Sequence, residues 1–184
     1  MTARDRNRDT VCLGLGANVG DRRGALCRAV QRLDADGRVC VEFDGGVAGL
    51  YETSPVGGPT GQRAYLNSAV RVTTTLSPIA LLELALRVEA SLGRVRGVPW
   101  GPRTIDIDVL LYGDRIVGGP RLTVPHPRLH ERRFVLEPLA EIAPDWRHPV
   151  LGVTVRVLAR RRAARATGET VVLVDAGGTE WYNA

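Results

Sequence analysis

The sequence has 184 residues, 44% of them apolar, which suffices for one compact domain and leaves no room for a second catalytic domain. Its net charge of +5 favours an anionic partner, either nucleic acid or a phosphorylated metabolite. No apolar run approaches the roughly 20 residues of a membrane span, and the charged opening MTARDRNRDT lacks the apolar core of a signal peptide.

The N-terminal part of the chain predicts a strand, a turn and a helix. Residues 1–10 are expected to be a disordered lead. Residues 11–15 are a short apolar strand candidate, and residues 16–21 form a turn into a helix, because apolar side chains repeat at helical spacing over residues 25–33. The segment GLGANVG lacks both the G-x-G-x-x-G spacing and a following Lys-Ser/Thr, so a tight turn is favoured over a phosphate-binding loop.

Further strands and one long loop follow. Residues 39–43 and 47–51 suggest two strands joined by a hairpin turn at Asp44-Gly45-Gly46. Residues 54–61, SPVGGPTG, contain three glycines and two prolines, too many for regular structure, which predicts a mobile loop of the kind that closes over ligands. The next strand is expected over residues 65–74.

A helix from Ser77 to about Leu92 is predicted because a hydroxyl N-cap is followed by a proline. Its periodicity places Glu89 on the inward face, where an acid needs a partner. From periodicity alone, the favoured interpretation is that Glu89 lies at the edge of the buried stripe and pairs with a nearby arginine.

The rest of the chain alternates loops with short elements. A loop over residues 93–102 leads into a strand, and residues 114–117 are expected to return beside that strand. Helices are predicted over residues 131–141, where Pro138 must interrupt or start the helix, and over the Arg-rich residues 155–166, and a strand over residues 171–174. The order β-α-β-β-α-β predicts an α+β, ferredoxin-like fold, an antiparallel sheet with helices on one face. We expect one domain over residues 11–150 and a C-terminal extension over residues 151–184.

The stretch GPRTIDIDVLLYG sets two carboxylates inside a run that is otherwise built like a buried strand. Successive side chains of a strand alternate faces, so Ile107, Val109 and Leu111 share one side. Asp106 and Asp108 share the other. At a separation of roughly 6 Å and an effective dielectric of about 20, two like charges repel by ~2–3 kcal/mol. A cation or a proton is therefore expected between them.

Two acids on one face, with few other carboxylates nearby, favour a hard cation such as Mg²⁺. Arginine forks match phosphate oxygens, and acids with Mg²⁺ plus arginines are the parts that phosphoryl transfer needs, which suggests ATP. The alternative for the acids is a strand-edge pair exposed to water. All 25 basic residues are arginine, so any single arginine can equally well be a solvated surface residue. Only a cluster of arginines is evidence for a phosphate-binding site. The cluster here comprises Arg94, Arg96, Arg103, Arg121 and Arg132.

Three aromatic residues, Tyr65, Trp100 and Phe134, are expected in or beside loops rather than in the apolar stripes. Rings at such positions can stack a flat heterocycle, although packing beneath a loop is commoner. The rival interpretation is a nucleic-acid-binding module, because ferredoxin-like sheets also bind RNA. It requires aromatics on open strands in an RNP-like pattern, and the sequence contains no such segment.

The stretches YETSPVG, YLNSAV, LGRVRGVPWGPRTIDIDVLLYG and RLTVPHPRLHERRFVLEPLAEIAP together resemble the 6-hydroxymethyl-7,8-dihydropterin pyrophosphokinases of folate biosynthesis. The similarity spans about residues 11–144, and GPRTIDIDVLLYG and LTVPHPRLHERRFVL are its most specific parts. The resemblance implies transfer of pyrophosphate from ATP to the hydroxymethyl oxygen of the pterin, with release of AMP.

For the nucleotide, the resemblance implies that Asp106 and Asp108 hold two Mg²⁺ ions that bridge the ATP phosphates. It implies that Arg94 and Arg103 act in catalysis, and that Glu89 borders the nucleotide instead of merely pairing with an arginine. The ATP contacts that it implies are Glu89, Arg94, Arg96, Trp100, Arg103, Val109, Arg121, Thr123, His126 and Arg132.

For the pterin, the resemblance implies that the bicycle stacks between Tyr65 and Phe134 and is read by Asn67 and Thr53. Residues 54–64 and 93–101 match the loops that close over both substrates and exclude water. The pterin contacts that it implies are Thr53, Ser54, Pro55, Val56, Tyr65, Asn67, Trp100 and Phe134.

The chain departs from the family pattern in two places. Family members can carry a polar residue at the position of Leu86 and a further basic residue within residues 97–99. The tail after about Val150 lies outside the specific match, and its Arg160-Arg161-Arg162 run is interpreted as a solvated helix face. The intact acid pair argues against an inactive nucleotide-binding relative.

The expected partners are ATP and the pterin, without nucleic acid or membrane, and a monomer is expected. Three cysteines without a CxxC pair argue against a zinc site or a disulfide framework and favour a reducing cytoplasm. Cys12, Cys27 and Cys40 are expected to be buried thiols.

Overall fold

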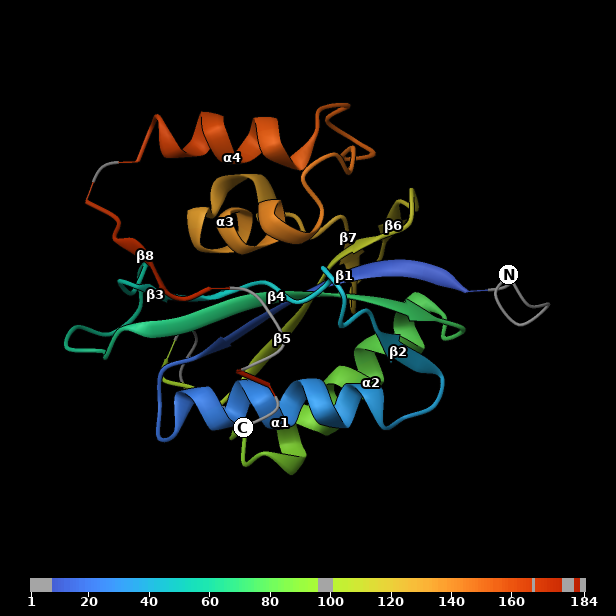
Figure 1. Cartoon of the computed structure of the whole chain (residues 1–184), viewed down its shortest axis with the longest axis horizontal. Helices are drawn as coiled ribbons and strands as arrows, with labels where there is room; N and C mark the ends of the chain where they lie inside the picture. Colours follow the sequence, from blue (N-terminus) through green and yellow to red (C-terminus); the bar gives the residue numbers. More distant parts are fainter. Residues whose placement is uncertain (1–7, 96–100, 167, 177–180, 183–184) are drawn as a thin grey trace.

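The computed structural model describes residues 8–95, 101–166, 168–176 and 181–182 (Figure 1). The strands are β1 (Asp9–Ala17), β2 (Val39–Val41), β3 (Leu50–Thr53), β4 (Tyr65–Thr74), β5 (Asp106–Tyr112), β6 (Val117–Gly118), β7 (Thr123–Val124) and β8 (Val171–Asp175). The helices are α1 (Arg22–Asp34), α2 (Pro78–Ser91), α3 (Arg133–Ile142) and α4 (Val155–Ala163), with a 3-10 turn, η2 (Leu129–Glu131), before α3.

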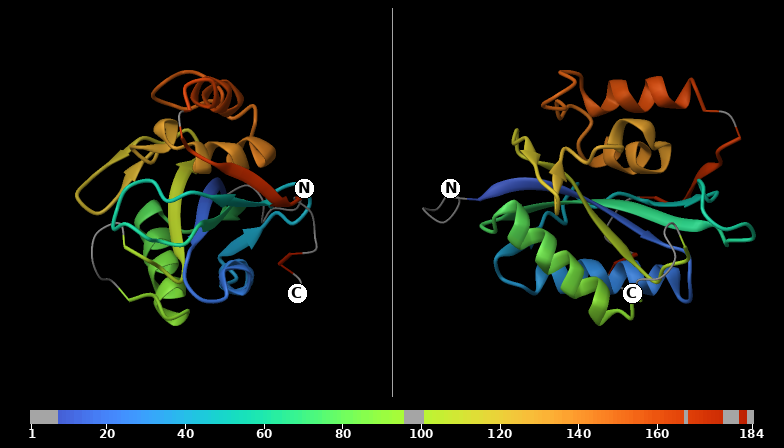
Figure 2. Two further views of the ribbon diagram at one scale, coloured as in Figure 1. Left: turned by 90° about the vertical axis from the view of Figure 1, so that its left-hand side faces the viewer. Right: turned by 180° about the vertical axis from the view of Figure 1, so that it is seen from behind.

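The main sheet has the strand order β5-β1-β4-β3-β8, and all of these neighbours are antiparallel. The path from β1 through α1, β3, β4 and α2 to β5 confirms the predicted ferredoxin-like arrangement. Figures 1 and 2 show α1 and α2 on one face of the sheet, and α3, with α4 outside it, on the other. The two helices of the β-α-β-β-α-β core therefore share one face as expected, and α3 and α4 add a second layer on the other face.

Both faces of the sheet are apolar, which explains why both are covered. Leu13 and Val70 pack in a core with α1 and α2, whereas their strand neighbours Cys12 and Ala69 pack in a second core with α3 and α4. Each cluster of buried apolar side chains needs its own helical layer to exclude water.

The helix starts follow their sequence signals. The Asp21 side chain accepts a hydrogen bond from the Gly24 N–H at 2.9 Å and caps α1. The Ser77 hydroxyl caps α2 ahead of Pro78, as predicted. The predicted helix over residues 131–141 begins at Arg133, and α3 contains Pro138.

The predicted hairpin between residues 39–43 and 47–51 does not form. β2 and β3 both pair with β4, at opposite ends of that ten-residue strand. The chain between them bulges away, with the Glu42 N–H donating to Arg71 O and the Arg71 N–H donating to Gly46 O. The long β4 accepts both segments along one edge, so they continue one another instead of folding together.

β5 contains an irregularity that alternation could not predict. Cys12 lies opposite Leu111 and Leu13 lies opposite Val109, so Leu110 is an extra residue in β5. As a result Leu111 packs in the core beside α3, away from Val109 on the other face, which corrects the prediction for Leu111. The predicted return of residues 114–117 beside β5 is also wrong, because β6 pairs with β7.

The C-terminal residues pack onto this fold. α4 lies against α3, β8 pairs with β3 and forms the edge of the sheet, and Trp181 is fully buried with its Nε1–H donating to Ala48 O at 3.0 Å. Cys12 and Cys27 are buried as predicted, whereas Cys40 is exposed on β2. In the described part of the chain, no helix is long and apolar enough to cross a membrane.

Candidate active site

A pocket of about 540 Å³ lies on the α3 side of the sheet, and glycines form part of its floor. Gly14 and Gly16 belong to β1, opposite Asp108 and Asp106 of β5. Asn67 of β4 lies on the other side of Gly16. The GLG segment is therefore strand instead of the predicted turn, which begins later, and its glycines leave the floor free of side chains.

If the pocket binds the pterin that the sequence resemblance implies, Gly16→Ala is expected to weaken that binding. A Cβ at this position would lie 2.8 Å from the Asn67 Oδ1 atom, so the amide must shift away from the Thr53 hydroxyl, to which it donates at 2.7 Å. Loss of one oriented hydrogen bond predicts a rise in the pterin KM of about tenfold. Steady-state kinetics at saturating ATP measure it. Gly118→Ala is the control, because its Cβ would meet nothing within 4 Å, and equal KM values for both variants would contradict the prediction.

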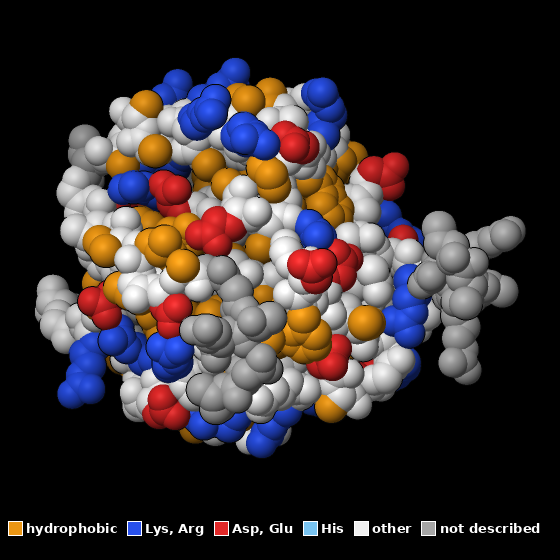
Figure 3. All heavy atoms as spheres, in the orientation of Figure 1, with side chains coloured by type: hydrophobic (Ala, Val, Ile, Leu, Met, Phe, Trp, Pro, Cys, Tyr) orange, Lys and Arg blue, Asp and Glu red, His pale blue; other side chains and the backbone are white. Residues whose placement is uncertain are grey.

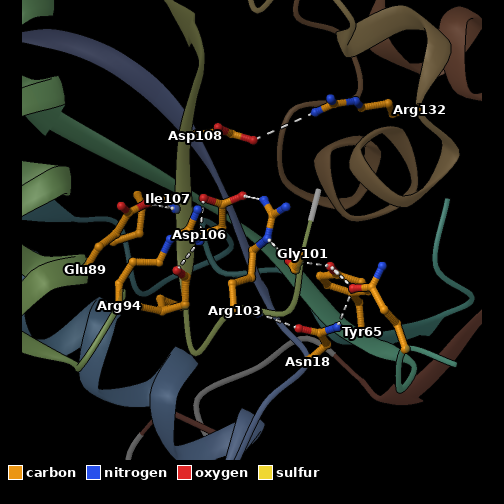
Figure 4. A network of polar contacts seen from close by, with 12 residues as sticks. Asn18, Tyr65, Glu89, Arg94, Gly101, Arg103, Asp106, Ile107, Asp108 and Arg132 are labelled. Carbon is orange, nitrogen blue, oxygen red and sulfur yellow. Dashed lines mark hydrogen bonds and ion pairs between the residues drawn. The ribbon is translucent and has the colours of Figure 1, made fainter. Parts of the chain in front are cut away.

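Asp106 is held between two arginines (Figure 4). Its Oδ1 lies 2.9 Å from the Arg94 Nη1, and its Oδ2 pairs with the Arg103 Nη1. Gly93, with φ of +81°, turns the chain directly after α2, and the Arg94 Nη1 also donates to Ile105 O at 2.6 Å. The turn and the backbone contact orient Arg94 toward β5, so both carboxylate oxygens are paired.

The negative charge of Asp108 is less fully compensated by arginines than the charge of Asp106. Its Oδ2 lies 3.9 Å from the Arg132 Nη1, and its side chain is 39% exposed. Desolvation by the surrounding protein, together with the charge of Asp106, raises the pKa of the Asp108 carboxyl to about 6, against the opposing effect of the arginines. A proton or a cation beside Asp108 would relieve this repulsion, as the sequence predicted.

Glu89 is buried, with 3% of its surface exposed, and its Oε1 accepts a hydrogen bond from the Ile107 N–H at 2.8 Å. This contact ties α2 to β5 between the two acids (Figure 4). This hydrogen bond fixes the part of β5 that carries the two carboxylates. The sequence identified Glu89 as an inward acid that needs a partner, and a backbone N–H is one of its partners.

The other end of the pocket contains the predicted ring and amide groups. Tyr65 and Phe134 line it, and Asn67 and Thr53 are buried beneath them and hydrogen-bonded to each other. Ser54 and Val56 also contribute to the wall. Of the described residues predicted for the pterin, Pro55 is the one that does not line this pocket.

A second hollow of about 260 Å³ shares Asp108 with the pocket and contains four of the predicted nucleotide residues. Burial, followed by the charge of Arg132, lowers the pKa of His126 to about 4, so its imidazole is neutral at pH 7. Arg121 pairs with Glu83 at 2.9 Å on the exposed rim. The four residues are Val109, Arg121, Thr123 and His126. Arg96 and Trp100 lie outside the described residues.

Sequence reasoning missed Asn18, which connects two sides of the pocket. Its Oδ1 accepts from the Arg103 N–H at 2.8 Å, and its own N–H donates to Arg103 O at 3.0 Å. Its Nδ2 donates to the Gln62 Oε1 at 3.2 Å, and the same Oε1 accepts from the Tyr65 hydroxyl. The buried amide thereby positions the Arg103 backbone relative to the loop before β4. Its place at the end of an apolar strand was the available signal.

Asn18→Ala is expected to lower kcat about tenfold and the free energy of unfolding by about 1–3 kcal/mol, because the Arg103 N–H loses its acceptor and the Gln62 amide loses a partner. Initial rates and chemical denaturation measure the two effects. Val19→Ala is the control, since Val19 is 38% exposed. A variant with normal kcat would contradict the positioning role.

The fold is ferredoxin-like, and the pocket combines paired acids and arginines with aromatic rings, a set of groups that fits a transferase of phosphate-bearing substrates. A family model described as 7,8-dihydro-6-hydroxymethylpterin-pyrophosphokinase (HPPK) matches residues 12–144. The chain belongs to this family of pyrophosphokinases of folate biosynthesis, which confirms the resemblance seen in the sequence.

Two relatives illustrate the similarity. The 2-amino-4-hydroxy-6-hydroxymethyldihydropteridine pyrophosphokinase of Bacillus subtilis is 48% identical over 130 residues, covering 71% of this chain and 75% of that protein. The protein of the same name from Methylorubrum extorquens is 50% identical over 144 residues, covering 78% of this chain and 87% of that protein.

Among solved structures, a Plasmodium falciparum HPPK-DHPS with pteroate matches with a TM-score of 0.67 and 14% sequence identity. The match covers 86% of this chain and 45% of that one, so the present chain spans less than half of that longer protein. At this identity the likeness supports the fold alone.

Proposed function

We propose that this chain transfers the terminal diphosphate of ATP, as one unit, to the hydroxymethyl oxygen of 6-hydroxymethyl-7,8-dihydropterin and releases AMP. The observation that carries the proposal is the division of one pocket into two chemically different ends. Asp106 and Asp108 lie at one end, and two rings with a buried amide lie at the other. Three arginines pair with the acids, and two of them, Arg103 and Arg132, also lie 5.9 and 5.7 Å from the ring centres of Tyr65 and Phe134. The family uses ATP as its co-substrate.

The acid pair fits Mg²⁺ that is shared with the substrate. Carboxylate oxygens are the ligands that Mg²⁺ prefers, and it keeps several positions for phosphate oxygens and water. Among the described residues, no group of three or more His, Cys, Asp or Glu side chains could hold a metal ion. The acid pair therefore does not fit a metal site whose ligands all come from the protein. We propose two ions at Asp106 and Asp108, where they would neutralise charge on the ATP phosphates.

The arginines at Asp106 have a second partner in this proposal. Arg94 and Arg103 neutralise Asp106 in the structure, and the triphosphate offers them stronger, bidentate acceptors. Transfer of these forks to the phosphates frees the Asp106 oxygens and places positive charge where negative charge develops. Tyr65 and Phe134 orient the pterin so that its hydroxyl faces the β-phosphorus.

The RNA-binding alternative finds less support. Helices lie on both faces of the sheet, so the strands do not offer the open aromatic platform that such a module needs (Figure 2). The rings face a pocket instead.

The test is a product analysis of the purified chain with ATP, Mg²⁺ and the dihydropterin. The proposal predicts that AMP and pterin diphosphate appear one for one, and that omission of the pterin abolishes AMP formation. A pterin that lacks the hydroxymethyl group is the matched control and is expected to give no AMP. Formation of ADP with a pterin monophosphate would reject the proposal in favour of a simple kinase.

A further inference from the structure

One arginine of α4 differs from its neighbours. Figure 3 shows basic side chains gathered at the top of the molecule, over α4. Arg160 and Arg161 are exposed, as predicted for a solvated helix face. The Arg162 side chain is only 20% exposed and lines the pocket together with Glu169, which corrects the interpretation of this run. Both residues lie beyond the family match, which ends at residue 144.

Arg162 contacts the side of the pocket that carries Phe134. Its Nε–H donates to the backbone oxygen of Glu131 in η2 at 2.6 Å. Three residues later the chain places Phe134 in the first turn of α3, where its ring lines the pocket. Arg162 therefore holds the backbone that leads to this ring.

Glu169 is fixed to the opposite side of the pocket through the residue that follows it. The Thr170 N–H donates to the Ser54 Oγ at 3.1 Å, and the Ser54 N–H donates to Thr170 O at 3.1 Å. The next residue, Val171, lies opposite Thr53 in the pairing of β8 with β3. The position of Glu169 is thus tied to the edge of the pocket that carries Thr53 and Ser54.

An ion pair joins these two sides, from the Arg162 Nη2 to the Glu169 Oε1. Among the described residues the other oxygen, Oε2, is buried without a hydrogen-bond partner, so the carboxylate depends on Arg162 for compensation. Removal of the guanidinium would leave a desolvated carboxylate that gains by moving toward water. We call Arg162, Glu169 and Thr170 the C-terminal bridge.

We propose that the C-terminal bridge sets the spacing between Phe134 and the Thr53–Ser54 edge and thereby determines the affinity for the pterin. Its members are positioning residues, since they act through the groups that contact the ring. Arg94 and Asp106 lie at the other end of the pocket, and in the described part of the chain neither forms an ion pair or a hydrogen bond with the C-terminal bridge, so binding of the nucleotide at this pair is not expected to depend on it. The inference rests on the proposed pterin substrate.

The experiment compares four variants: Arg162→Gln, Glu169→Gln, the two together, and Arg161→Gln as the matched control on the exposed face of α4. The KM for the dihydropterin, the KM for ATP, kcat and the thermal midpoint are measured for each. We expect each single variant to raise the pterin KM about tenfold with little change in the KM for ATP. The double variant is expected to match the single ones, because both residues act through one contact.

Several results would overturn the inference. The first is a pterin KM for Arg162→Gln that equals the pterin KM of Arg161→Gln. If the unmodified chain still formed AMP, this result would reject the inference and leave the proposed function intact. Parallel losses in both KM values, kcat and thermal midpoint would show a general folding role. If the increase in pterin KM for the double variant equalled the product of the two single increases, the two residues would act separately. An unmodified chain that forms no AMP would reject the proposed function and, with it, this inference.

Discussion

Asp106→Asn is expected to lower the rate of AMP formation by about 10³-fold or more while the protein stays folded. The substitution keeps the shape of the side chain but removes the charge that lies between Arg94 and Arg103. A neutral amide is a poor ligand for Mg²⁺ and leaves two guanidiniums with excess positive charge. Single-turnover measurement of AMP release, with circular dichroism to confirm folding, tests this expectation.

The control for Asp106→Asn is Asp114→Asn, which changes an exposed carboxylate two residues after the end of β5. It is expected to retain the full rate. Retention of activity by Asp106→Asn within a factor of ten would contradict the proposed metal site, because a true ligand cannot be removed at so small a loss.

Arg103→Ala is expected to lower kcat by about 10²–10³-fold with a smaller change in the KM for the pterin. Its guanidinium pairs with Asp106 and also lies 5.9 Å from the centre of the Tyr65 ring, between the acidic end of the pocket and the ring end. In the proposed reaction, positive charge at this point would stabilise a transition state in which negative charge builds on the transferred group. Steady-state kinetics with both substrates varied separate the two parameters.

Arg115→Ala is a closely matched control for Arg103→Ala. Arg115 pairs with Asp9 at 2.7 Å and lies 5.2 Å from the centre of the Tyr112 ring, so it repeats the same contacts outside the pocket. It is expected to leave kcat unchanged. If both variants lost activity equally, the effect of Arg103 would be one of general charge or folding.

Local signals predicted the parts of the fold that depend on neighbouring residues. Ser77 followed by Pro78 identified the start of α2, and alternation placed Asp106 and Asp108 on one face of β5. These features follow from the backbone geometry of a few consecutive residues. The candidate site was therefore recognisable in outline, with its acids, arginines and rings.

Features that depend on distant contacts were not predictable. The bulge at Leu110 moves Leu111 to the other core, and only the pairing of β5 with β1 reveals it. Arg162 looked like its exposed neighbours because the sequence does not show that η2 and Glu169 lie beside it. Asn18 gave no motif, since its partners lie 44 and 85 residues away.

Transfer of the diphosphate as one unit is tested by following the two terminal phosphates of ATP. One reaction contains ATP labelled at the β-phosphate and the other contains ATP labelled at the γ-phosphate, each with Mg²⁺ and the dihydropterin. Intact transfer predicts that both labels enter the pterin product in equal amounts and that AMP is unlabelled. A pterin product that carries the γ label alone, with the β label left in ADP, would contradict transfer of the diphosphate as one unit.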